Sequence, residues 1–270
     1  MPIHKNEAIR SPPLVRTKKM NSDKLTELEH YNNAYKSLLE KEKLPNIRGS
    51  EGMPLFLRTP YVHYESQILS IIKPEHRVLE LCAGTGLHTK ALLETGADVV
   101  VTDIASYALN LVRERFGSVY SNFTTELADI EKLPFRDACF DVVACAGSLS
   151  YGEPLMVDSE IERVLRPGGY LVFVDSFNEN PIYRLNRWYQ YILGKRTKGT
   201  FERIPDADRL IGLSSRYSSI DVQYFGAFTF IMPFFCAVIG EERSAMLSDR
   251  LDNFFSVRRS AFKIAGVARK

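Results

Sequence analysis

The 270-residue chain has few of the residues that build metal centres and disulfide scaffolds. Its four cysteines, Cys82, Cys139, Cys145 and Cys236, form no C-x-x-C pair, and there are only five histidines. Such spacing argues against structural zinc, thioredoxin-type redox chemistry and a disulfide framework. We therefore expect no metal, and cysteines that stay reduced, as in the cytoplasm.

Long apolar runs and a surplus of one charge are also missing. The 35 Lys and Arg residues against 33 Asp and Glu residues give a net charge of +2, whereas nucleic-acid-binding domains are clearly basic. The longest apolar candidate, residues 227–240, contains Pro233 and falls short of the ~18 residues that span a membrane. No apolar signal-peptide core follows the basic start. We expect a cytoplasmic protein without a nucleic-acid partner or a spanning helix.

Apolar and helical segments alternate along the middle of the chain, which predicts an α/β fold. Strands are expected at 77–82, 98–103, 123–128, 140–146, 169–174, 219–225 and 260–268, and helices at 23–43, 61–72, 88–95, 106–116, 158–165, 181–198 and 241–253. Strands that alternate with helices form parallel β-α-β units. Their nearly continuous apolar character predicts a sheet covered on both faces.

The expected organisation is one large domain behind a disordered basic tail. The tail covers residues 1–21 and the domain residues 22–270. We divide the domain into an N-terminal helical lid (22–74), a cofactor-binding core (75–176), a basic lid insertion (177–218), and closing strands and a helix (219–270).

The sequence VLELCAGTG at 78–86 is the segment most informative about chemistry. It places a strand, a glycine turn with Gly84 and Gly86, and a helix in succession. Asp103 ends the next strand and could accept hydrogen bonds from ribose hydroxyls. No third glycine follows to complete a dinucleotide fingerprint, and Glu80 would repel a pyrophosphate. A cationic, amino-bearing ligand suits this carboxylate, which favours S-adenosylmethionine over NAD.

Five segments in order resemble the class I S-adenosylmethionine-dependent methyltransferases, in particular their small-molecule branch. The segments are VLELCAGTG (78–86), VVVTDIA (99–105), LADIEKLPF (127–135), FDVVACAGSLSY (140–151) and RVLRPGGYLVFVD (163–175). The resemblance implies a Rossmann-like, seven-stranded, mostly parallel sheet of order 3-2-1-4-5-7-6 with helices on both faces and a helical lid. It also implies an enzyme with S-adenosylmethionine as its cofactor.

The resemblance further implies which residues bind that cofactor. One departure is Cys82, which stands where the family has its first motif glycine. The implied contacts are Glu80 near the methionine moiety, Cys82, Ala83, Gly84 and Gly86 in the turn that faces methionine and ribose, Asp103 at the ribose with Ile104 on adenine, Asp129 and Ile130 beside adenine, and Ala146 and Gly147 near the sulfonium.

Methyl transfer requires an acceptor held in line and freed of a proton. As catalytic candidates the sequence offers His63 in the lid, Tyr151 after the fourth motif and Asp175 at a strand end; for Asp175, capping of the next turn is the ordinary alternative. His88 is interpreted as a partly buried helix residue. The segment after residue 146 lacks an Asn-Pro-Pro-aromatic tetrad, which disfavours methylation of DNA or protein glutamine.

The segment 180–203 is basic and aromatic, with apolar residues at helical spacing. Three interpretations stay open: a solvated face over a packed face, a lid whose Arg184 and Arg187 bind a phosphate-bearing substrate, and contact with an anionic membrane surface. The segment is also similar to methyltransferases of polysaccharide and glycoconjugate synthesis.

These features lead to a predicted acceptor class. The leading prediction is O-methylation of a sugar, glycan or natural-product hydroxyl on a small-molecule acceptor. The alternatives are N-methylation of an amino sugar or small amine, and a catalytically silent cofactor-binding interaction module. Nothing in the sequence predicts the oligomeric state.

Overall fold

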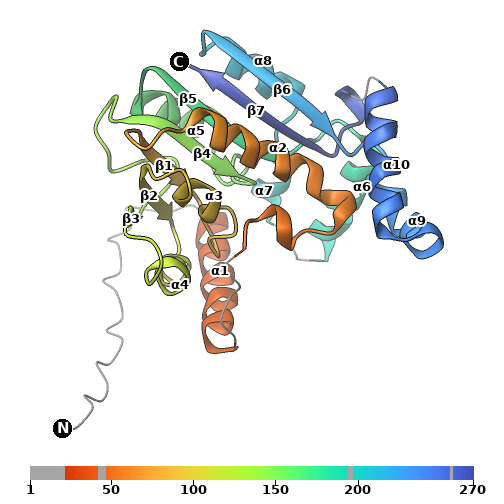
Figure 1. The fold of residues 1–270 in the computed structure, drawn as a ribbon, viewed down its shortest axis with the longest axis horizontal. Coiled ribbons are helices and arrows are strands. Elements are labelled where there is room, and N and C mark those ends of the chain that lie inside the picture. Colours follow the sequence, from red (N-terminus) through yellow and green to blue (C-terminus); the bar gives the residue numbers. More distant parts are fainter. Residues whose placement is uncertain (1–21, 42–46, 194–196, 256–257) are drawn as a thin grey trace.

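The computed structural model describes residues 22–41, 47–193, 197–255 and 258–270. These residues fold around one seven-stranded sheet in the order β3-β2-β1-β4-β5-β7-β6 (Figure 1). The strands are β1 (Arg77–Leu81), β2 (Asp98–Asp103), β3 (Phe123–Leu127), β4 (Phe140–Ala146), β5 (Leu165–Ser176), β6 (Ser219–Phe225) and β7 (Lys263–Arg269). The predicted fold class and strand order are confirmed. The predicted tail, residues 1–21, lies outside the described residues.

The sheet is parallel from β3 to β5, and β7 inserts antiparallel between β5 and β6. Successive side chains of a strand point to opposite faces. In β1, Val78 accordingly belongs to the core under α2 and α4, whereas Leu79 belongs to the core under α5 and α8. Because both faces are covered, both positions are apolar, and this explains the continuous apolar strands.

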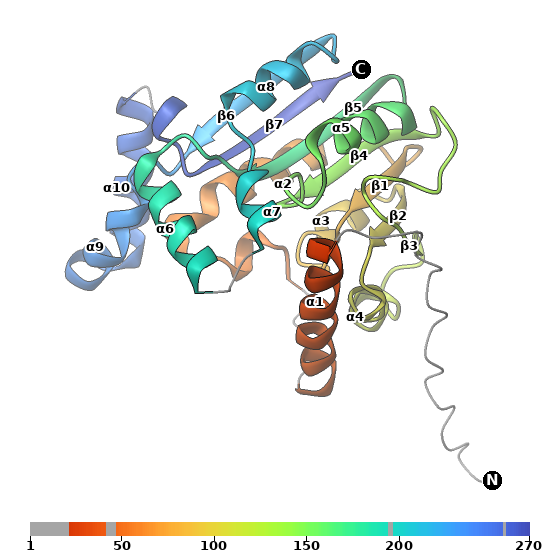
Figure 2. The same cartoon turned by 180° about the vertical axis from the view of Figure 1, so that it is seen from behind.

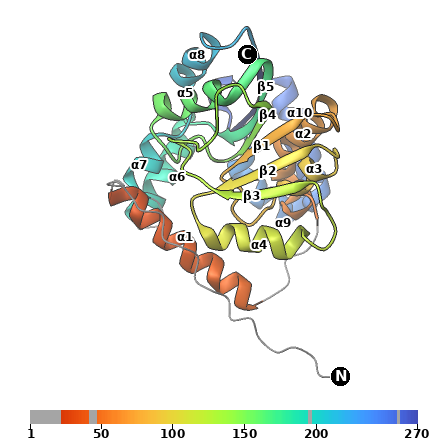
Figure 3. The same cartoon turned by 90° about the vertical axis from the view of Figure 1, so that its left-hand side faces the viewer.

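Helices form a layer on each face of the sheet (Figure 3). One layer contains α2 (Leu55–Ile71), α3 (Thr89–Leu93) and α4 (Ser106–Phe116), with α10 (Glu241–Phe254) packed against α2. The other contains α5 (Pro154–Val164) and α8 (Ala207–Ser214). The expected start of α2 at residue 61 is wrong, because Pro60 lies inside the helix rather than before it.

Helix α6 (Pro181–Ile192) shows the opposite orientation to the one that its amphipathic pattern suggests. The expected continuous helix 181–198 ends at Ile192, and α7 (Lys198–Glu202) is separate. On α6, Arg187 is 4% exposed, while the apolar Leu185 and Trp188 are 64% and 48% exposed. The interpretation as a solvated basic face over a packed apolar face is therefore wrong for the described residues of this segment.

Arg187 is buried because backbone carbonyls surround it. Its Nη1 donates to the carbonyl oxygen of Phe177 at 2.6 Å and to Oδ1 of Asn178 at 3.1 Å. Its Nη2 donates to the carbonyl oxygen of Phe262 at 3.3 Å. The guanidinium thus fastens α6 to the end of β5 and to the segment before β7, and it is a structural cation rather than a substrate contact.

At one end of the molecule, α6, α9 (Met232–Ile239) and α10 lie together (Figures 1 and 2). Within the part of the chain that the structure describes, no helix combines the length and apolarity that crossing a membrane demands.

Replacement of Arg187 by Met should destabilise the fold by about 2 kcal/mol, because carbonyls that now accept from a buried cation lose their donor. Arg184→Met on the exposed side of the same helix is the matched control and should change stability by less than about 0.5 kcal/mol. Urea unfolding of the two variants measures the difference. Equal stabilities would contradict the anchoring role.

Candidate active site

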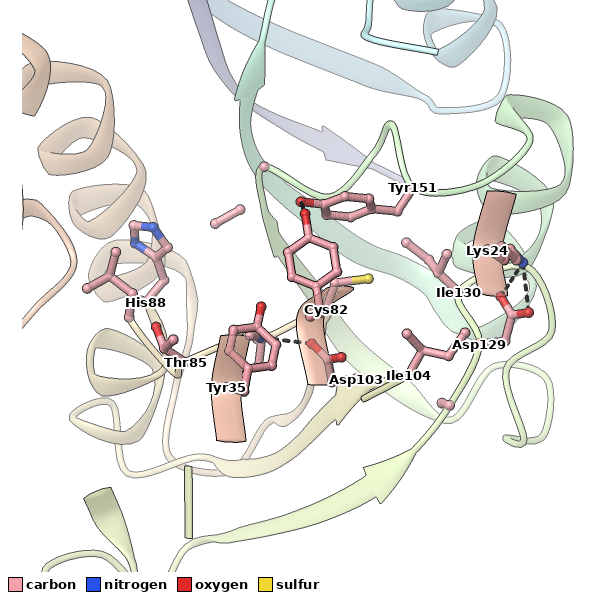
Figure 4. Close-up of a pocket in the computed structure, with 17 residues that line it drawn as sticks. Lys24, Tyr35, Cys82, Thr85, His88, Asp103, Ile104, Asp129, Ile130 and Tyr151 are labelled. Atoms are coloured by element: carbon pink, nitrogen blue, oxygen red, sulfur yellow. Dashed lines mark hydrogen bonds and ion pairs between the residues drawn. The ribbon is translucent and has the colours of Figure 1, made fainter. Parts of the chain in front are cut away.

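A cavity of about 250 Å³ lies at the carboxyl ends of β1, β2 and β4, with α1 (Ser22–Lys41) across it (Figure 4). This is the edge where open α/β sheets bind ligands. The lining residues are Lys24, Tyr31, Tyr35, Cys82, Ala83, Gly84, Thr85, Leu87, His88, Asp103, Ile104, Ala128, Asp129, Ile130, Ala146, Gly147 and Tyr151. Nine of the predicted cofactor-binding residues are among them; Glu80 and Gly86 are not.

The turn after β1 brings its backbone to the cavity. Cys82 has φ 52°, a left-handed conformation that costs a non-glycine residue roughly 1 kcal/mol. Gly84, with φ 55°, faces the cavity, where a Cβ would stand 3.0 Å from the Tyr35 hydroxyl. At Gly86 a Cβ would meet Val112 at 3.0 Å. Gly86 therefore permits the close approach of α4, and it is not among the residues that line the cavity.

Asp103 joins the ends of two strands beside the cavity. One carboxylate oxygen accepts from the backbone N–H of Gly84 at 2.8 Å, and the other accepts from the N–H of Ala105 at 2.8 Å. Burial raises the pKa of Asp103, and these N–H groups oppose that shift because they stabilise the carboxylate. Each carboxylate oxygen can accept a second hydrogen bond, so the side chain can also receive two ribose hydroxyls.

Glu80 lies behind the turn rather than in the cavity wall. Its side chain is 3% exposed and accepts a 2.7 Å hydrogen bond from Oγ1 of Thr89, at the start of α3. Burial raises the pKa of Glu80 to about 7. Any influence of Glu80 on a ligand would therefore pass through the backbone of the turn.

Helix α1 closes the cavity through three side chains that the sequence analysis did not assign to the site. Nζ of Lys24 lies 2.7 Å from both carboxylate oxygens of Asp129 and also pairs with Glu131. The Tyr31 hydroxyl lies 2.8 Å from that of Tyr151. Tyr35 covers Gly84. The available signal was the spacing of Lys24, Tyr31 and Tyr35, which places them on one face of a helix expected to belong to the lid.

The structure separates the three catalytic candidates. Tyr151 lines the cavity (Figure 4). Asp175 is buried behind it and accepts from the N–H groups of Leu149 at 2.9 Å and Ser176 at 2.6 Å, so it positions the loop that carries Tyr151. His63 is on α2, its ring centroid 5.5 Å from that of Phe225 on β6; it does not line the cavity.

His88 lies in the cavity wall, although the sequence analysis set it aside. Its ring stacks on Tyr61 at 5.1 Å between centroids. Burial, with Lys263 and Arg115 adding to it, lowers the pKa of His88 to about 4. The imidazole is therefore neutral at physiological pH and can accept a hydrogen bond. The predicted substrate cations Arg184 and Arg187 do not line this cavity.

Residues 79–173 match a family model described as "Methyltransferase domain". The chain contains a class I S-adenosylmethionine-dependent methyltransferase domain. This confirms the resemblance found in the sequence for the family; the glycoconjugate branch is not confirmed.

The relatives cover only part of the chain. A demethylmenaquinone methyltransferase of Clavibacter sepedonicus is 37% identical over 115 residues, which are 42% of this chain and 46% of that protein. The chain thus spans about half the length of this relative.

Solved structures share the fold at lower identity. Geranyl diphosphate C-methyltransferase of Streptomyces coelicolor, with S-adenosyl-L-homocysteine, has a TM-score of 0.58 at 14% identity, covering 92% of this chain and 97% of that one. Phosphoethanolamine N-methyltransferase 2 of Haemonchus contortus, with S-adenosyl-L-methionine, has a TM-score of 0.55 at 16% identity, covering 76% of this chain and 52% of that one.

The cavity fits S-adenosylmethionine, which is the cofactor of this domain. Asp103 offers a carboxylate for the ribose. Gly147 has φ 71° and no atom within 4 Å of where a Cβ would stand, so a ligand can approach its backbone closely. Oδ1 of Asp129 accepts from Lys24 and from the N–H of Glu131, whereas Oδ2 accepts from Lys24 and keeps acceptor capacity for an adenine amino group.

Removal of the Asp103 side chain in Asp103→Ala should weaken S-adenosylmethionine binding by at least about ten-fold, the loss expected when charge-assisted hydrogen bonds disappear. Asp98→Asn, at the exposed start of the same strand, should bind like the parent protein. Isothermal titration calorimetry checks both. Unchanged affinity in Asp103→Ala would contradict the assignment.

The buried carboxyl of Glu80 makes stability depend on pH. Its pKa in the folded protein, about 7, exceeds the ordinary 4.5, so the folded state binds the proton more tightly. Its contribution is favourable below pH 4.5 and is lost as the pH rises to about 7, with up to about 3 kcal/mol at stake. Glu80→Gln keeps an acceptor for Thr89. At pH 8 it should unfold at a higher temperature than the parent protein, and at pH 4.5 it should not.

Thermal unfolding at the two pH values measures this difference. Glu126→Gln, which removes an exposed carboxylate from β3, is the control and should follow the parent at both. If Glu80→Gln lost as much thermal stability as the parent protein between pH 4.5 and pH 8, the buried carboxyl of Glu80 would not be the cause of that loss.

Proposed function

We propose that the chain transfers a methyl group from S-adenosylmethionine to a small aromatic acceptor of the phenol or quinol class. The aromatic end of the cavity carries this proposal. Tyr31, Tyr35 and Tyr151 line it, with the rings of Tyr31 and Tyr35 stacked at 5.6 Å and those of Tyr31 and Tyr151 edge-to-face at 5.8 Å. Flat aromatic molecules pack favourably on such rings. The demethylmenaquinone methyltransferases among the relatives support this class.

The titratable groups at the aromatic end of the cavity include no strong general base. They favour an acceptor that is nucleophilic without one. The bound cofactor supplies an electrophilic methyl group. Burial raises the pKa of Tyr151, so its phenol stays neutral and serves to orient the acceptor. His88 is a weak base, and Asp175 is turned away into backbone contacts. A phenol or quinol gives up a proton far more readily than a sugar hydroxyl, and so needs less from a base.

The cations expected for a phosphate-bearing sugar acceptor are placed elsewhere. Arg187 holds backbone carbonyls. Lys24 is the cation among the lining residues, and it pairs with Asp129 and Glu131. Methylation of a glycan oxygen is therefore the weaker candidate. N-methylation of an amine and a silent binding module are outcomes that the same assay detects. The cytoplasmic location remains a prediction from the sequence.

Acceptor identity can be tested with purified protein, radiolabelled S-adenosylmethionine and four acceptors: a chemically reduced short-chain naphthoquinol without a ring methyl group, a catechol, an amino sugar and a nucleotide sugar. We expect labelled product from the naphthoquinol or catechol, in excess over the Asp103→Ala background, because these acceptors need the least help from a base. Product from the sugars alone would contradict the proposal. Cofactor binding without any product would indicate the silent module.

A further inference from the structure

The strongest feature outside the cavity is a set of large apolar side chains exposed at one end of the molecule. We call it the apolar end face. Its members are Leu185, Trp188 and Ile192 on α6, Phe234 and Val238 on α9, and Phe254 at the end of α10. Their exposed fractions range from 48% for Trp188 to 82% for Phe254. Apolar groups exposed together mark an interaction site on a folded protein.

Hydrogen bonds and ring contacts connect the helices of the apolar end face. The hydroxyl of Tyr183 on α6 donates to the carbonyl of Gly226 at 2.7 Å and accepts from the N–H of Phe230 at 3.1 Å. Phe230 lies in η2 (Thr229–Ile231), the turn that leads into α9. Phe228, just before it, lies 5.7 Å from Phe255 at the end of α10. Figures 1 and 2 show α6, α9 and α10 at the same end of the fold.

The fold holds this arrangement in place. Arg187 and Tyr183 are the buried residues of α6, and both are fixed by backbone partners. The apolar side of α6 consequently cannot turn inward without breaking these bonds. Exposure of the apolar end face is thus built into the folded chain.

The exposed charges beside the apolar end face include more basic than acidic groups. Helix α6 exposes Arg184 and carries no acid, and α9 carries no charge; the exposed acids Glu241 and Glu242 begin α10, which also exposes Arg243 and Arg250. The exposed Arg258 and Arg259 of η3 (Arg258–Ser260) are close to the start of α6, since Asn180 at its N-cap donates to the carbonyl of Ser260 at 2.8 Å. Lys198 begins α7 after α6 and pairs with Glu202 at 3.6 Å.

We propose that the apolar end face docks the protein on an anionic membrane surface. Helices that lie in a bilayer interface expose Trp, Phe and Leu on one side, with Lys and Arg near the lipid phosphates. The exposed cations Arg184, Arg258 and Arg259 are complementary to anionic lipid headgroups, whereas a symmetric dimer would place this basic patch against the same basic patch of its partner. The proposal does not depend on the identity of the methyl acceptor.

The chain's single tryptophan makes the test direct, because Trp188 belongs to the apolar end face. Vesicles of equal parts phosphatidylglycerol and phosphatidylcholine should sediment the protein and shift Trp188 emission to the blue. Pure phosphatidylcholine vesicles should do so much less, and Arg184→Gln should weaken binding by about five-fold, the effect of one basic residue near an anionic surface. Equal binding to both vesicle types would overturn the choice of an anionic surface.

Two variants distinguish binding through the apolar end face from nonspecific vesicle binding by exposed apolar side chains. The double variant Leu185→Glu/Phe234→Glu should lose vesicle binding by at least about ten-fold, since two apolar contacts become charged. Leu155→Glu alters an apolar side chain of similar exposure on α5 and should bind like the parent.

Light scattering gives the oligomeric state of each variant. A dimer that the double variant abolishes, with no vesicle binding by the parent, would overturn the proposal. So would vesicle binding that the double variant retains. These assays contain no acceptor or cofactor, so their failure is distinct from a failure of the proposed methyl transfer.

Discussion

The carboxylate of Asp103 is the constraint on which the site depends. Because it accepts hydrogen bonds from the N–H groups of Gly84 and Ala105, it fixes the turn after β1 against the end of β2. With the turn held, Gly84 presents its backbone to the cavity, and Tyr35 of α1 can lie over it. The same carboxylate keeps free acceptor positions on its cavity side. One buried acid thereby orders the protein backbone and prepares the place of the ribose.

The cofactor half of the fold could be predicted because its residues repeat local rules. Buried parallel strands are apolar throughout, and a turn that must approach a ligand uses glycine, so β1, β2 and β4 and the residues at their ends were found. The sequence does not distinguish a glycine that lines a cavity from one that admits a helix: Gly84 lines the cavity, whereas a Cβ at Gly86 would meet Val112 of α4.

The N-terminal lid itself was expected, but the side chains that the lid and the end helices turn toward the cavity or the solvent could not be predicted, for a different reason. Helical spacing shows which residues share a face, but not which surface that face meets. Tyr31 and Tyr35 share a face that meets the cavity rather than the core. The backbone carbonyls of Phe177 and Phe262 accept hydrogen bonds from the guanidinium of Arg187 on α6. Arg187 therefore points inward, and the apolar residues of α6 point outward. Long-range hydrogen bonding overrides hydropathy there.

The central claim is that S-adenosylmethionine occupies the cavity between the strand ends and α1. Hydrogen–deuterium exchange with and without S-adenosylhomocysteine tests it most directly, because slower exchange reports local closure. Slowing of exchange should be confined to residues 82–88, 103–105, 128–131, 146–151 and α1, and NAD should produce none. Slowing elsewhere in the described chain, with these segments unchanged, would contradict the account.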